Sequence, residues 1–137
     1  MGRIVAIDFG LARCGIAITD PLKIIAQPLI CLPNDVHFIE KLKAYGPFEK
    51  IVIGLPLHMN GKESPMAQQV RAFAAILEQK LAVPIVFWDE RLTSAQAERT
   101  LKEANLSRKE RSKKNDTLAA TLILESFLQL KRFDLGQ

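Results

Sequence analysis

The sequence predicts an α/β domain in which a mixed β-sheet of five strands is flanked by α-helices. Three observations support this prediction. The first third of the chain is patterned as strands with short links, and the remainder alternates between helical and strand patterns. The chain has 137 residues, of which 48% are hydrophobic, enough for one core but not for two. We therefore expect residues 1–137 to form a single domain.

Three apolar segments near the start are typical of β-strands: Arg3 to Phe9, Gly15 to Thr19 and Ile24 to Leu32. Turn residues separate them, with Gly10 after the first segment and Asp20-Pro21 after the second. Because the links are short, neighbouring strands must run antiparallel. We expect a three-stranded meander.

Helix and strand patterns alternate from there on. Apolar residues recur at helical spacing from Val36 to Tyr45, and this pattern stops at Gly46-Pro47. A short apolar segment from Lys50 to Ile53, ending at Gly54, predicts the fourth strand.

The second helix has a recognisable start. Ser64 is a good N-cap residue, and Pro65 fits the first helical position. Apolar residues continue one helical face as far as Leu81, and Ile85 to Trp88 then predicts the fifth strand, which ends at Asp89.

Two further helices are expected after that strand. Thr93 to Gln96 fits a capping box, which predicts a helix that continues to about Ala104. Apolar periodicity predicts a last helix around Lys113 to Leu130. Between them, Asn105 to Lys114 is polar and nearly free of apolar residues, which is typical of a loop.

Acidic residues follow two of the predicted strands. Asp8 ends the first strand, and Asp89-Glu90 ends the fifth. In open α/β sheets, ligands bind beyond the carboxyl ends of the strands. A third acid, Asp116, falls in register with the apolar face of the last helix, where an unpaired carboxylate is costly. We expect Asp8, Asp116 and either Glu90 or Asp89 to form an acidic cluster.

Such a cluster is suited to a divalent cation, because carboxylates held close together repel one another. Mg²⁺ or Mn²⁺ prefers oxygen ligands and is the expected cofactor. Two-metal sites of this kind hydrolyse phosphodiester bonds. Each acid also has a structural alternative, with Asp8 as a turn residue, Asp89 as the ion-pair partner of Arg91, and Asp116 as a helix N-cap. Their joint placement favours catalysis.

Charge is concentrated in one segment. The whole chain carries a formal charge of +4, whereas the segment from Arg99 to Lys114, with seven basic and two acidic residues, carries +5. This segment leads directly to Asp116, so it could hold a polyanion beside the acids. Aromatic residues make up only 7% of the chain, which favours recognition of backbone and shape over base stacking.

Two other features are less specific. The segment from Gly54 to Lys62 joins a strand to a helix, so its backbone amides could face a phosphate, although a structural loop would look similar. Cys14 and Cys31 lie beside and within predicted strands and have no zinc-ligand spacing, which predicts free thiols in a reducing cytosol. No secretory signal or membrane span is expected.

Four motifs, in this order, resemble one bacterial family. They are Asp8-Phe9-Gly10 with Arg13 and Gly15; Ile53-Gly54-Leu55-Pro56 through Gly61; Asp89-Glu90-Arg91-Leu92-Thr93-Ser94; and Asp116 with Ala119-Ala120 and Ile123-Leu124. Together they are similar to the YqgF family, also called RuvX. Its members have an RNase H-like fold related to Holliday junction resolvases and are assigned as pre-16S rRNA nucleases. The similarity covers nearly the whole chain.

The resemblance implies an RNase H-like fold and a role in maturing the 5′ end of 16S rRNA during ribosome assembly. It also implies an active site of Asp8, the Asp89-Glu90 pair and Asp116. Two positions depart from the family pattern: Ala12 stands where a lysine is usual, and Asn115 stands where an apolar residue is preferred. Loss of that lysine could weaken a phosphate contact.

The sequence thus predicts a cytoplasmic, divalent-metal-dependent nuclease. The residues expected to bind metal are Asp8, Glu90 and Asp116, supported by Asp89. The residues expected to contact phosphate are Arg13, Arg91, Lys113 and Lys114. The expected partners are structured nucleic acid, either pre-rRNA or branched DNA, and ribosomal precursor particles, with the protein a monomer or homodimer.

Two alternatives remain. A resolvase of four-way DNA junctions would act as a dimer, because resolution needs paired cuts. A non-catalytic factor would use the same fold and basic segment to bind ribosomal precursors or the transcription machinery.

Overall fold

The computed structural model describes residues 2–92 and 115–135, with the backbone alone at 115, 116 and 132–135. Its elements, in chain order, are β1 (Arg3–Asp8), β2 (Arg13–Thr19), β3 (Ala26–Pro33), α1 (Phe38–Lys43), β4 (Phe48–Leu55), α2 (Pro65–Leu81), β5 (Ile85–Asp89), the 3₁₀ turn η1 (Glu90–Leu92) and α5 (Asn115–Leu135).

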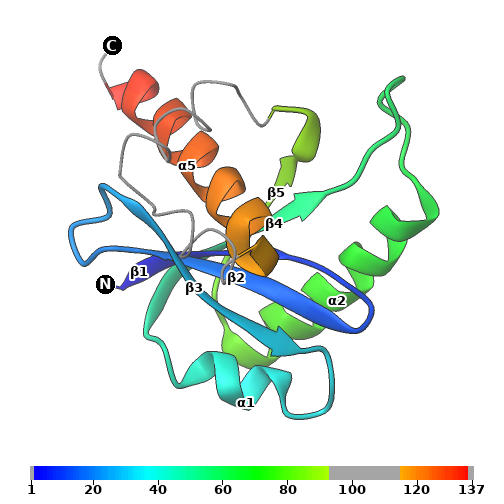
Figure 1. The fold of residues 1–137 in the computed structure, drawn as a ribbon, viewed down its shortest axis with the longest axis horizontal. Helices are drawn as coiled ribbons and strands as arrows, with labels where there is room; N and C mark the ends of the chain where they lie inside the picture. The colour runs from blue at the N-terminus through cyan, green and yellow to red at the C-terminus, as the bar shows by residue number, and fades with distance from the viewer. Residues whose placement is uncertain (1, 93–114, 136–137) are drawn as a thin grey trace.

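Five strands form one sheet in the order β3-β2-β1-β4-β5 (Figure 1). The first three pair antiparallel, while β1, β4 and β5 run parallel. The predicted meander and mixed five-stranded sheet are confirmed.

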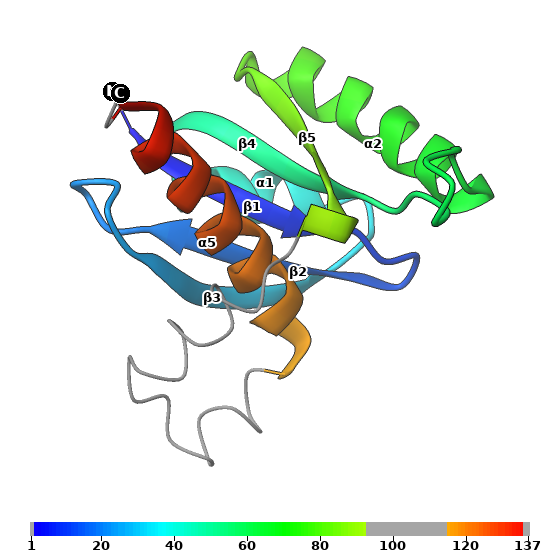
Figure 2. The ribbon, with the colours of Figure 1, turned by 90° about the horizontal axis from the view of Figure 1, so that it is seen from above.

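Alternate residues of β1 belong to two different cores. Val5 and Ile7 pack with the apolar side chains of α1 and α2. Ile4 and Ala6 pack with those of α5. Figure 2 shows α5 on one side of the sheet and α1 on the other. Because side chains alternate along a strand, Asp8 belongs to the α5 side together with Ala6.

Some element boundaries differ from the predicted ones. The β3 strand begins at Ala26, not at Ile24, because the Asp20 carboxylate accepts hydrogen bonds from the amides of Ile24 (2.7 Å) and Ile25 (2.8 Å) and so holds both in a turn. The α1 helix is shorter than predicted and ends at Lys43. Its exit is closed by short-range bonds, such as the Tyr45 amide to the Leu42 carbonyl at 3.0 Å.

The α2 helix begins as predicted. The Ser64 side chain accepts a hydrogen bond from the Ala67 amide at 3.1 Å, with Pro65 at the first helical position. The α5 helix continues to Leu135, beyond the predicted end at Leu130. The helix predicted from Thr93 and the loop predicted from Asn105 to Lys114 lie outside the described residues.

The α5 helix closes the second core over the sheet. Its Phe127 ring meets the Trp88 ring of β5 edge to face, with centroids 5.9 Å apart. Its Ile123 and Leu124 are buried against β1 and β4 residues such as Ala6 and Val52. This packing sets the position of α5 relative to the ends of the parallel strands.

Both cysteines are free thiols, as predicted, with Cys14 buried and Cys31 partly so. Within the described ranges, the structure contains no helix that is long and apolar enough to cross a lipid bilayer.

Candidate active site

Two of the predicted acids, Asp8 and Glu90, line one cavity at the carboxyl ends of the parallel strands. Asp8 is the last residue of β1, and Glu90 opens the 3₁₀ turn directly after β5. The cavity measures about 230 Å³, and α5 supplies its other wall through Ala119, Leu122 and Ile123. The fold thus brings together two acids that are far apart in the sequence.

A glycine makes this meeting possible. The β4 strand lies between the two acidic strands, and its Gly54 is paired with Trp88 of β5, two residues before Glu90. A Cβ atom at Gly54 would lie 2.6 Å from Glu90 Oε1 and 2.7 Å from Ile123 Cδ1. A Cβ at this position would force the ends of both side chains to move, so the glycine lets the Glu90 side chain lie over β4 towards Asp8.

In the sequence, Gly54 marks a strand end and belongs to one of the motifs, but neither observation predicts this role. A signal was present, because a glycine within an apolar strand often marks a close approach of another group.

The two acids share an environment that disfavours their charged forms. Burial raises the pKa of Asp8. Burial also raises the pKa of Glu90, and the negative charges of Asp8 and Asp89 raise it further. No basic side chain of the described residues lines this cavity. Partly buried carboxylates without a cationic neighbour attract a hard divalent cation, so the donor set fits Mg²⁺ or Mn²⁺.

Asp89 has a different environment. Arg91 Nε lies 3.0 Å from each oxygen of its carboxylate, and Arg91 Nη2 lies 2.6 Å from Oδ2. The backbone amide of Arg91 donates a further bond to Oδ1 at 2.9 Å. These hydrogen bonds lower the pKa of Asp89. The ion pair between Asp89 and Arg91, which the sequence offered as the structural alternative for Asp89, is therefore present. Asp89 does not line the cavity of Asp8 and Glu90.

Arg91 also reaches the segment between β4 and α2. Its Nη1 donates to the Met59 carbonyl at 3.1 Å. Residues 57–63 form a small hairpin, closed by a bridge between Leu57 and Glu63 and by the His58 amide bonding the Lys62 carbonyl at 2.8 Å. Figure 1 shows this link extending away from the sheet. Arg91 thus joins the end of β5 to the hairpin.

The loop after Asp8 is held tightly. A Cβ atom at Gly10 would overlap the Arg13 carbonyl oxygen, so the turn that the sequence places at Gly10 requires a residue without a side chain. Asn34 secures the loop, since its Nδ2 donates to the Gly10 carbonyl at 2.8 Å and its amide donates to the Ala12 carbonyl at 2.9 Å. Arg13 begins β2 beyond this loop and is exposed.

The structure locates the backbone of Asp116 but not its side chain. Asp116 lies in the first turn of α5, three residues before Ala119, which lines the cavity. That separation is about one helical turn. Lys113 and Lys114 lie outside the described residues. Within the described part of the chain, no three His, Cys, Asp or Glu side chains form a metal-binding group.

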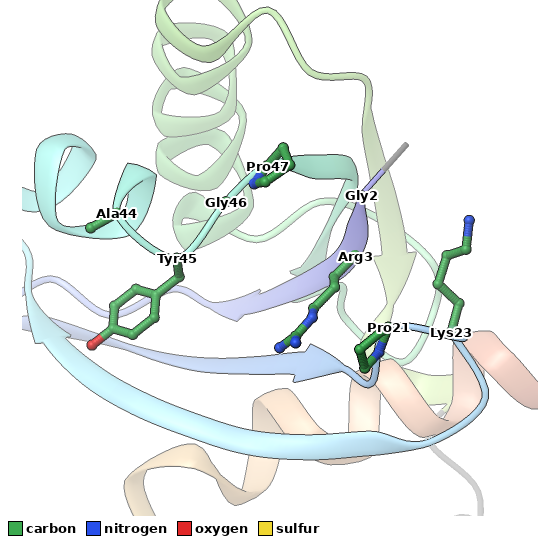
Figure 3. A pocket seen from close by; sticks show the side chains of 8 residues that line it. All are labelled: Gly2, Arg3, Pro21, Lys23, Ala44, Tyr45, Gly46 and Pro47. Atoms are coloured by element: carbon green, nitrogen blue, oxygen red, sulfur yellow. The ribbon is translucent and has the colours of Figure 1, made fainter.

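A larger cavity, of about 580 Å³, lies at the opposite end of β1 and is shown in Figure 3. It is lined by Gly2, Arg3, Pro21, Lys23, Ala44, Tyr45, Gly46 and Pro47. No carboxylate is among these residues, so this cavity lacks the chemistry of the acidic one. Arg3 and Asp8 are five residues apart on one strand, a separation of about 17 Å.

Comparisons with known proteins identify relatives of this chain. The family model described as RuvX, Holliday junction resolvase, matches residues 2–130. A protein of Protochlamydia amoebophila is 44% identical over 92% of this chain and 92% of its own length. A protein of Koribacter versatilis is 41% identical over 97% of this chain and 90% of its own length. Both carry the name "Putative pre-16S rRNA nuclease".

Solved structures bear on the fold. The chain is similar to Thermus thermophilus RuvC in complex with a Holliday junction substrate, with a TM-score of 0.67 and 14% identity over 98% of this chain and 96% of that one. A second Thermus thermophilus RuvC structure gives a TM-score of 0.57 at 12% identity, covering 98% of this chain and 97% of that one. RuvC is RNase H-like, so the predicted fold is confirmed.

Proposed function

Since the chain belongs to the RuvX family, we propose that it is a divalent-metal-dependent nuclease that processes the 5′ end of pre-16S rRNA. The observation that carries this proposal is the pairing of Asp8 and Glu90 in one cavity at the carboxyl ends of the parallel strands. The names of the relatives support the RNA substrate. The expected setting is the cytoplasm, on ribosomal precursor particles.

In this proposal, Asp8 and Glu90 hold the cation, and Asp116 from the first turn of α5 completes the site. A bound Mg²⁺ or Mn²⁺ would supply positive charge that stabilises the phosphate as the bond breaks and lowers the pKa of an attacking water. The half-buried carboxylates favour this cation, because no basic side chain of the described residues lines their cavity and offsets their negative charges.

The remaining polar residues act around that centre. Asp89 supports the site by fixing Arg91, whose guanidinium in turn holds the hairpin at Met59. The proposed phosphate contacts are Arg13, Arg91, Lys113 and Lys114. For Arg91, such a contact would use the N–H groups that Asp89 and Met59 leave available.

The test compares the wild-type protein with Asp8→Asn, each with Mg²⁺ or Mn²⁺, on precursor rRNA and on four-way DNA. We expect the wild type to cut the precursor and the variant to show background cleavage only. Asp35→Asn is the matched control, because Asp35 is an exposed acid whose carboxylate accepts a hydrogen bond from the nearby His37 amide. Equal cleavage by the wild type and Asp8→Asn would refute the mechanism.

A junction-resolving DNA nuclease is the second candidate, favoured by the description of the family model. It predicts a homodimer and a preference for four-way DNA over RNA in the same assay. A complementation experiment distinguishes a non-catalytic binding role from catalysis. If Asp8→Asn and Asp116→Asn chains restore growth of a depleted strain, catalysis is dispensable.

A further inference from the structure

Two lysines meet on the α5 side of the sheet, at the opposite end of β4 from Glu90. The Nζ atom of Lys50, on β4, lies 5.7 Å from the centre of the Phe127 ring. The Nζ atom of Lys131, on α5, lies 5.8 Å from the same centre. Two ammonium groups therefore gather around one aromatic ring.

No described carboxylate forms an ion pair with either lysine. Glu49, the nearest in sequence to Lys50, is bound elsewhere, because Lys23 Nζ lies 2.7 Å from its Oε2. Burial lowers the pKa of Lys50, and the charge of Lys131 lowers it further, while Glu49 acts in the opposite sense. Among the side chains that the structure describes, the positive charge of the pair is thus in excess.

Such an arrangement favours a bound anion. Each ammonium gains some cation–π attraction from Phe127, but the ring carries no net charge and leaves the two groups repelling each other. A phosphate group relieves the repulsion, because its oxygens can accept hydrogen bonds from both ammonium groups at once.

The pair lies on the same side of the sheet as the acidic cavity. Lys50 and Gly54 are four residues apart on β4, which corresponds to about 13 Å. Lys131 and Ile123 are eight residues apart on α5, which corresponds to about 12 Å. Since Ile123 lies next to Gly54, the distances estimated along β4 and along α5 agree. The lysine pair and the acidic cavity are therefore about 13 Å apart on one side of the sheet, so a single nucleic-acid strand can contact both.

We propose that Lys50 and Lys131 together bind one phosphate group of the nucleic-acid strand whose scissile phosphate lies at Asp8 and Glu90. The assignment of this phosphate to a nucleic acid rests on the proposed function. The pair adds affinity and sets the direction of the strand, and it does not touch the bond that is cut.

The first experiment measures binding of an RNA duplex, by fluorescence anisotropy without divalent cations, over a series of salt concentrations. We expect Lys50→Gln/Lys131→Gln to bind several-fold more weakly at low salt. The slope of log K against log salt should fall by up to about 0.9, the value for one phosphate contact. The matched control is Lys41→Gln/Lys43→Gln, which removes the same charge from exposed positions of α1 on the other side of the sheet.

The proposal fails if the two double variants have the same affinity and slope. Lys50→Arg/Lys131→Arg should keep most of the slope, because it keeps both charges. Should the double glutamine variant not fold, Lys131→Gln alone decides the question, since Lys131 is exposed.

A second experiment is independent of nuclease activity. Inorganic phosphate is titrated into the protein, and backbone amide NMR shifts are followed at the start of β4 and the end of α5. We expect saturable shifts that vanish in Lys50→Gln/Lys131→Gln. If the wild type shows them but cuts no substrate, the proposed function fails and the phosphate site stands. If the wild type cuts RNA and shows no such shifts, the site fails and the function stands.

Discussion

At the scale of single residues, the absence of a side chain at Gly54 decides whether Glu90 reaches Asp8. We predict that Gly54→Ala abolishes most cleavage, because the added Cβ would displace the Glu90 carboxylate. It should also cost about 1–3 kcal/mol of stability, as overpacked core positions do. Cleavage assays and urea unfolding measure the two effects.

A second substitution separates these effects. Ile123→Val removes the Cδ1 atom that a Cβ at Gly54 would strike, but it leaves Glu90 in the way. The double variant Gly54→Ala/Ile123→Val should therefore regain stability without regaining activity. Recovery of both would mean that the position of Glu90 does not matter for cleavage.

The raised pKa values of Asp8 and Glu90 predict how metal-free stability depends on pH. A carboxyl with a higher pKa in the folded state holds its proton longer there than in the unfolded chain. The free energy of unfolding therefore falls as pH rises from the ordinary carboxyl pKa through the raised one. Glu90→Gln removes this penalty, so it should have a higher Tm than the wild type at neutral pH.

Thermal unfolding from pH 4 to 8 in the presence of a chelator measures this difference. The Tm gap between Glu90→Gln and the wild type should shrink as pH falls, because the wild-type acids then become protonated. Added Mg²⁺ should raise the Tm of the wild type more than that of the variant. A variant less stable than the wild type at every pH would contradict the prediction.

At the scale of elements, Arg91 couples the end of β5 to the hairpin of residues 57–63. Arg91→Gln removes the ion pair to Asp89 and the bond to the Met59 carbonyl. We expect faster hydrogen exchange at the amides of His58 and Gly61, whose hydrogen bonds close the hairpin. Because the ion pair is partly exposed, overall stability should change by less than about 1 kcal/mol.

Steady-state kinetics of the Arg91→Gln variant tests whether the hairpin contributes to cleavage. If the hairpin positions substrate, Arg91→Gln should raise KM more than it lowers kcat. Arg3→Gln is the control, since Arg3 is a cation at the opposite end of β1. Unchanged exchange in the hairpin would show that Arg91 does not hold it.

At the scale of the whole molecule, the excess positive charge is the feature that predicts the partner. The segment from Arg99 to Lys114 carries a charge of +5 in the sequence and lies outside the described residues. Lys113→Gln/Lys114→Gln should weaken nucleic-acid binding and lower the salt slope by up to about 1.8, for two phosphate contacts. Salt-dependent anisotropy measures both quantities, and unchanged binding would exclude these lysines.

The two basic regions can be combined in one experiment. If Lys113 and Lys114 bind the strand independently of Lys50 and Lys131, the free-energy losses of the two double variants should add in the quadruple variant. A loss well below the sum would mean that the regions compete for the same phosphate groups.

Local sequence patterns were sufficient for the strand order within the meander, the acids at the ends of β1 and β5, and the start of α2 at Ser64. Each depends on residues close together in the chain, such as an N-cap followed by proline or an alternating apolar run. Boundaries were less predictable, since β3 starts late for a reason that its own residues do not contain. The Asp20 carboxylate holds Ile24 and Ile25 in the preceding turn.

The tertiary structure alone decided which acids face each other. Asp89 and Glu90 are adjacent in the sequence, yet one pairs with Arg91 and the other enters the cavity of Asp8. Successive side chains at a strand end diverge, and the side that each takes depends on what packs there, here Gly54 and α5. The meeting of Lys50 and Lys131 around Phe127 arises in the same way, because it depends on where α5 crosses β4. Contacts between distant segments follow from packing, which no local pattern encodes.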